Sequence, residues 1–111
     1  MFEQLFASRI VEKILFYMIA NKKCFASELR RSFEIPIFGI QRALTRLENQ
    51  GILVSVVEGN NRLYYWNPKY PFINEFKGFI EKAYSSLPED FKKKYYERAV
   101  RKRPRKKGKP L

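Results

Sequence analysis

The sequence predicts a mostly helical domain that carries one small β-hairpin. Residues 25–50 have the pattern of two helices joined by a short turn, and residues 51–66 then form two β-rich runs separated by Gly59-Asn60-Asn61, which is typical of a hairpin turn. The chain has 111 residues, enough for one ordinary core and too few for two typical domains. We expect a core over residues 1–70, further helices over 71–100 and a basic tail over 101–111.

The first helix is expected from Gln4 to Asn21, where apolar side chains recur at helical spacing. They form two neighbouring stripes, one with Val11 and Ile14 and a second with Ile10 and Tyr17. A helix that is apolar over so much of its surface is normally covered on both sides. We therefore expect either a carboxyl-terminal helix or a second subunit to cover the second stripe.

The paired helices of the central segment follow. Ser27 is a suitable cap for a short helix that ends near Phe33. The next helix is expected over residues 37–50, because Pro36 suits a first turn and Gly51 ends the helical pattern. At 100° per residue, its buried side is expected to hold Ile40, Ala43, Leu44 and Leu47.

Two further helices are expected after the hairpin, one from Phe72 to Leu87 and one from Glu89 to about Val100. The first of them is amphipathic and is the best candidate to pack on the amino-terminal helix. We expect the following residues at a dimer contact: Ile10, Ile14, Tyr17, Phe76, Phe79 and Ile80.

The formal charge of +12 is concentrated near the carboxyl terminus. Residues 101–109 carry seven positive charges and no acid, together with a proline and a glycine, so we expect a disordered basic tail. Such a tail attracts polyanions, with nucleic acid as the first candidate, an anionic membrane as the second and a purely solubilising role as the plain alternative. Its cations are Arg101, Lys102, Arg103, Arg105, Lys106, Lys107 and Lys109.

The outward face of the helix over residues 37–50 is the candidate reading surface for DNA. Arg42 has a planar fork that fits guanine O6 and N7, the amides of Gln41 and Asn49 match adenine, and Thr45 suits a thymine methyl or a phosphate. In helix-turn-helix proteins the second paired helix enters the major groove. The full set of candidate contacts comprises Phe38, Gln41, Arg42, Thr45, Arg46 and Asn49 on this helix, Arg30 and Arg31 at the DNA backbone, and Asn60, Asn61 and Arg62 at the hairpin tip.

Several aromatic residues have more than one interpretation. Phe38 fits a DNA contact, a protein contact or local packing, since exposed aromatics also mark protein interfaces. Tyr64 and Trp66 fit either cover for the core or base stacking, of which we favour cover for the core.

No residue pattern indicates catalysis, a metal site or a bound cofactor, because the chain has no histidine, one cysteine and no Gly-rich phosphate loop. We expect Cys24 to be a partly buried structural thiol, with a redox-sensing thiol favoured by Lys22 and Lys23 as the alternative. The longest apolar stretch has seven residues and the amino terminus lacks a leader pattern, so we expect a cytoplasmic protein without a membrane partner.

From about residue 5 to residue 87 the chain resembles the winged helix-turn-helix DNA-binding regulators of the ArsR-like group. The matching segments are LFASRIVEKIL, FASELRRSFEI, IQRALTRLENQGIL and EGNNRLYYWNPKYPFINEFKGFIEK. The resemblance implies a homodimer that binds operator DNA through Gln41, Arg42, Thr45 and Arg46, with wing contacts from Asn60, Asn61 and Arg62. The chain lacks the cysteine and histidine ligands of metal-sensing members, and residues 36–39 replace the polar residues usual at the front of the recognition helix.

These observations predict a non-enzymatic, dimeric, sequence-specific binder of double-stranded DNA, acting in transcription regulation. The alternative is a protein-interaction adaptor, antitoxin-like or part of a complex-assembly system, in which the same scaffold binds a protein partner. A third possible function is RNA binding, with the basic tail making most of the contacts.

Overall fold

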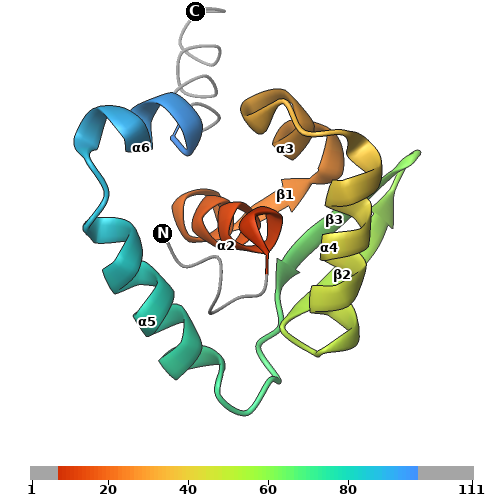
Figure 1. The fold of residues 1–111 in the computed structure, drawn as a ribbon. Coiled ribbons are helices and arrows are strands. Elements are labelled where there is room, and N and C mark those ends of the chain that lie inside the picture. Colours follow the sequence, from red (N-terminus) through yellow and green to blue (C-terminus); the bar gives the residue numbers. More distant parts are fainter. Residues whose placement is uncertain (1–7, 98–111) are drawn as a thin grey trace, which may run out of the picture.

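The computed structural model describes residues 8–97, which form five helices and a three-stranded antiparallel sheet (Figure 1). The elements are α2 (Arg9–Asn21), β1 (Lys23–Phe25), α3 (Ala26–Phe33), α4 (Ile37–Asn49), β2 (Leu53–Glu58), β3 (Asn61–Trp66), α5 (Ile73–Ser85) and α6 (Glu89–Tyr95). The expected combination of helices with a β-hairpin is confirmed. The expected start of the first helix near Gln4 and the expected basic tail lie outside the described residues.

Helix α2 lies at the centre of the fold, with α5 and α6 on one side and the sheet, α3 and α4 on the other (Figure 1). Five consecutive residues, from Ile14 to Met18, are at most 1% exposed. Consecutive helical residues point in all directions around the axis, so this part of α2 is covered on every side. The chain itself supplies this cover, including the carboxyl-terminal helix expected on the second apolar stripe.

Tyr96 closes the cover over α2. Its side chain is 2% exposed, and its ring meets Phe16 edge-on at 5.8 Å and Tyr84 at 5.7 Å between centroids. The Asn21 side-chain amide donates to the Tyr96 carbonyl at 2.7 Å, which joins the end of α2 to the end of α6. Burial, and next the negative charge of Glu12, raise the pKa of the Tyr96 phenol well above its usual range.

Helix α4 packs with the face that its sequence pattern predicts. All four expected core residues are at most 8% exposed: Ile40, Ala43, Leu44 and Leu47. A three-residue turn joins α3 to α4, in which Glu34 adopts a left-handed conformation with φ of 56°. Pro36 then precedes the first helical residue, where the lack of an N–H group costs nothing.

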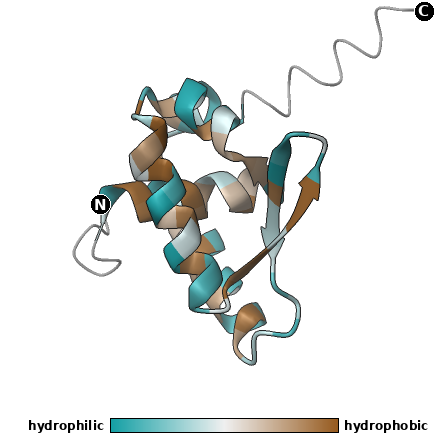
Figure 2. Ribbon diagram, turned by 90° about the vertical axis from the view of Figure 1, so that its right-hand side faces the viewer, coloured by the Kyte–Doolittle hydropathy of each residue, from teal (hydrophilic) through white to brown (hydrophobic). Residues whose placement is uncertain are grey.

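The sheet has the order β1-β3-β2, so β3 lies in its centre. Tyr64 in β3 is opposite both Cys24 in β1 and Ser55 in β2. The β2–β3 hairpin closes through Gly59, with φ of 62°, and Asn60, and projects from the helices (Figure 2). Near its tip, the hydrophobic end of β2 lies beside the hydrophilic start of β3 (Figure 2).

Two helix starts differ from the sequence prediction. Ser8 has an extended backbone, and its Oγ accepts hydrogen bonds from the N–H groups of Ile10 and Val11, so the predicted helix does not pass through Ser8 and α2 begins at Arg9. The prediction that Ser27 caps the next helix is also wrong. Helix α3 begins at Ala26 with Phe25 at the cap position, two residues before Ser27, and the Glu28 carboxylate accepts the N–H of Phe25 at 3.0 Å.

Three other elements were not predicted correctly. The strand β1, over Lys23–Phe25, was not expected at all. Helix α5 is shorter than predicted, since Phe72 precedes it and Leu87 follows it. Helix α6 ends at Tyr95, before the expected Val100, and residues 98–100 lie outside the described part of the chain.

The six residues expected at a dimer contact do not share one surface. Ile14, Tyr17 and Ile80 are at most 1% exposed within the single chain and belong to its core. They are not available to a partner, because the chain itself buries them. Ile10 and Phe76 are half-buried, and Phe79 is exposed.

Candidate nucleic-acid interface

All six candidate reading residues of α4 are solvent-exposed and line one open depression of about 560 Å³. They lie opposite the apolar face that packs into the core, which leaves their side chains available to a ligand. None of the described residues that line this depression is acidic: Phe38, Gln41, Arg42, Thr45, Arg46, Asn49 and Gln50. Gln50, at the end of the helix, was not predicted to belong to this surface.

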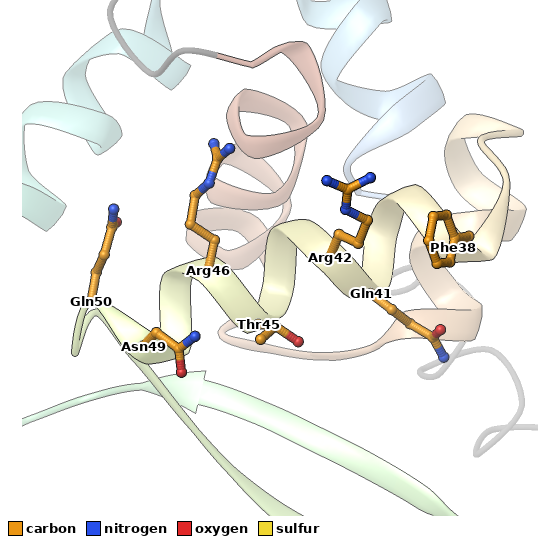
Figure 3. Close-up of a pocket in the computed structure, with 7 residues that line it drawn as sticks. All are labelled: Phe38, Gln41, Arg42, Thr45, Arg46, Asn49 and Gln50. Atoms are coloured by element: carbon orange, nitrogen blue, oxygen red, sulfur yellow. The ribbon is translucent and has the colours of Figure 1, made fainter.

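The polar side chains of the depression form two rows (Figure 3). Arg42 and Arg46 point along one edge, whereas Gln41, Thr45 and Asn49 point along the other. The residues in each row are four apart, so each row follows one side of the helix. The arrangement offers guanidinium donors on one side and groups that both donate and accept on the other, as a surface that reads base edges requires.

Arg42 and Arg46 also line a second hollow, between α4 and the amino-terminal end of α2. The two helices approach closely there, because a methyl group added at Gly39 would lie 3.1 Å from Ile10 Cδ1. This close contact fixes the position of the amino-terminal end of α4 on the core.

Arg30 and Arg31 are exposed on the last turn of α3, as the sequence predicts for outward side chains. They line a separate hollow with Glu34, Ile35 and Pro36. Because that turn leads directly into α4, the two arginines extend the positive surface beyond the front end of the helix.

At the hairpin, Asn60, Asn61 and Arg62 are exposed. Arg62 is held by a hydrogen-bond chain that the sequence did not predict. Its Nη1 donates to Ser55 Oγ at 3.1 Å, and Ser55 Oγ donates to Glu48 Oε2 at 2.7 Å. The hydroxyl therefore links a cation on β3 to a carboxylate on α4 and holds the hairpin beside that helix.

The remaining aromatic residues of the hairpin support the core. Tyr64 is 7% exposed, and Trp66 donates its indole N–H to the Met18 carbonyl at 3.3 Å. This burial favours cover for the core over base stacking.

Cys24 is fully buried in β1, more deeply than expected. Its burial, and next the negative charge of Glu28, raise the pKa of the thiol well above its usual range. A buried and protonated thiol is a poor nucleophile, which contradicts the redox-sensing alternative.

Within residues 8–97, no three histidine, cysteine or acidic side chains lie close enough to hold a metal ion. No helix in the same range has the length and apolar character needed to cross a membrane. Comparison with protein-family models, curated proteins and solved structures finds no match to this chain.

Proposed function

We propose that this chain is a winged helix-turn-helix protein that binds double-stranded DNA in a sequence-specific manner and acts as a cytoplasmic transcription regulator. In this proposal α3 and α4 are the paired helices, α4 enters the major groove, and the β2–β3 hairpin is the wing. The observation that carries the proposal is the outward face of α4, where six exposed side chains capable of reading or packing against base pairs line one depression.

Electrostatics support duplex DNA as the ligand. Arg42 and Arg46 lie on α4, Arg30 and Arg31 lie on the preceding helix, and Arg62 is held beside α4 on the hairpin. Cations on both sides of a reading helix suit the phosphates that border a groove.

Selection from a pool of random duplexes tests this function. The full chain is incubated with the pool at about 50 and 200 mM salt, and the retained duplexes are sequenced. We expect one sequence motif to be enriched at both salt concentrations. Binding that disappears at the higher salt and enriches no motif would overturn sequence-specific recognition.

We further propose a homodimer that forms on the outward side of α5. Phe72 and Phe79 are 65% and 45% exposed on this side, and such apolar surface is common at subunit contacts. A dimer would place its two copies of α4 in successive major grooves about 34 Å apart and would enrich a two-fold symmetric motif. Sedimentation of Phe79→Asp should give a monomer, and an unchanged dimer would place the contact elsewhere.

The second candidate function is a protein-interaction adaptor. The exposure of Val56 and Val57 at the hairpin, 47% and 61%, favours it, because apolar strand residues at a sheet edge suit a protein partner more than phosphate groups. This function predicts that the full chain co-purifies with one defined polypeptide and that Val57→Lys abolishes the association.

A further inference from the structure

Phe38 is the most exposed large apolar side chain in the part of the chain that the structure describes, at 66%. It is the second residue of α4, and its helix packs on the core through the opposite face. The adjacent Gly39 makes the close contact with α2, so the Phe38 ring is not required to hold the helix in place. Covering an exposed phenyl ring removes apolar surface from water, so a ligand that packs on Phe38 would gain affinity.

Arg42 lies one helical turn beyond Phe38, at the same end of the depression (Figure 3). Its Cζ is 5.5 Å from the centre of the Phe38 ring, within the range of a cation–π contact. No ion pair involves Arg42 among the described residues. The ring thus supports the side chain while the guanidinium keeps its donors for a ligand.

We propose that Phe38 and Arg42 together recognise a pyrimidine C5-methyl group next to a guanine in the major groove. This inference rests on the proposed DNA-binding function and assigns a base specificity to the amino-terminal part of α4. The C5-methyl of thymine is the apolar group that a base pair presents in the major groove, and guanine presents the two acceptors that fit an arginine fork. An apolar ring beside a guanidinium matches these two neighbouring features.

The same methyl group can come from thymine or from 5-methylcytosine, and substituted duplexes separate the two sources. The starting duplex carries the motif that the full chain enriches. In one arm each thymine beside a guanine is replaced by deoxyuridine, which removes only the methyl group. In the other arm each cytosine beside a guanine is replaced by 5-methylcytosine, which only adds it.

The expected result is a change of about fourfold in Kd at one position, the equivalent of about 0.8 kcal/mol for one buried methyl group. Phe38→Ala should lose this response and bind both forms of the duplex equally. Phe91→Ala is the matched control, since Phe91 also has an exposed phenyl ring but lies on α6, and it should respond as the unchanged chain does.

Two results would overturn the inference. If the unchanged chain binds every pair of duplexes equally, or if Phe38→Ala keeps the same fourfold response, the ring does not contact a methyl group and a protein contact becomes its explanation. A selection that enriches no motif at all overturns the proposed function, and this inference with it, so the two failures are distinguishable.

Discussion

Replacing Tyr96 by phenylalanine should make the fold more resistant to alkaline pH. The unfolded chain releases the phenol proton near pH 10, whereas burial raises the pKa in the folded chain well above that value. A raised folded pKa means that the stabilising contribution is complete below about pH 9 and falls as the pH rises above 10. If the folded phenol is still protonated at pH 11, the loss at that pH is about 1.4 kcal/mol.

Tyr96→Phe keeps the ring contacts with Phe16 and Tyr84 and removes only the titrating group. Urea unfolding of both chains at pH 8 and pH 11 measures the effect, and the other titrating groups cancel in the difference between the chains. The drop in unfolding free energy from pH 8 to pH 11 should be smaller by about 1.4 kcal/mol in Tyr96→Phe. Equal drops in the two chains would refute the burial of Tyr96 against α2.

Three other changes test the packing and the tail. Gly78→Ala in α5 should stabilise the fold by about 0.5–1 kcal/mol, because the new methyl group meets no atom within 4 Å. Gly39→Ala should stabilise it less, since its methyl group would lie 3.1 Å from Ile10 Cδ1. Thermal unfolding compares the two variants, and a larger gain for Gly39→Ala would contradict the close contact of α2 and α4. Ser8→Ala should cost about 1 kcal/mol in urea unfolding, and no loss would mean that Ser8 does not cap α2. Removing residues 101–111 should weaken binding to all duplexes alike and flatten the salt dependence, and an unchanged slope would exclude a phosphate contact by the tail.

The elements with strong local patterns were predictable from the sequence. Ile40, Leu44 and Leu47 recur at helical spacing, and this pattern gave both the packed face of α4 and its exposed opposite face. The hairpin was predictable for the same reason, because Gly59 and Asn60 provide a turn between two β-rich runs.

The elements that depend on distant contacts were not predictable. The strand β1 has only three residues and exists because it pairs with β3, forty residues later, through contacts such as Cys24 with Tyr64. The hydrogen bond from Ser55 to Glu48 likewise depends on how the hairpin lies against α4. The apolar pattern of α2 identified side chains that need cover without specifying which element supplies it, which is why Ile14 and Tyr17 were assigned to a dimer contact.

The most direct test of the central claim, that the outward face of α4 binds duplex DNA, compares two variants that each remove one positive charge. Arg42→Ala removes a cation from this face, and Lys93→Ala removes one from an exposed position on α6. Both are titrated with the enriched duplex and with an unrelated duplex at the same salt concentration. We predict that Arg42→Ala weakens binding to the enriched duplex by about 1–3 kcal/mol, about fivefold to 150-fold, while Lys93→Ala changes it by less than about twofold. Equal losses in the two variants would contradict the claim and show that only overall charge matters.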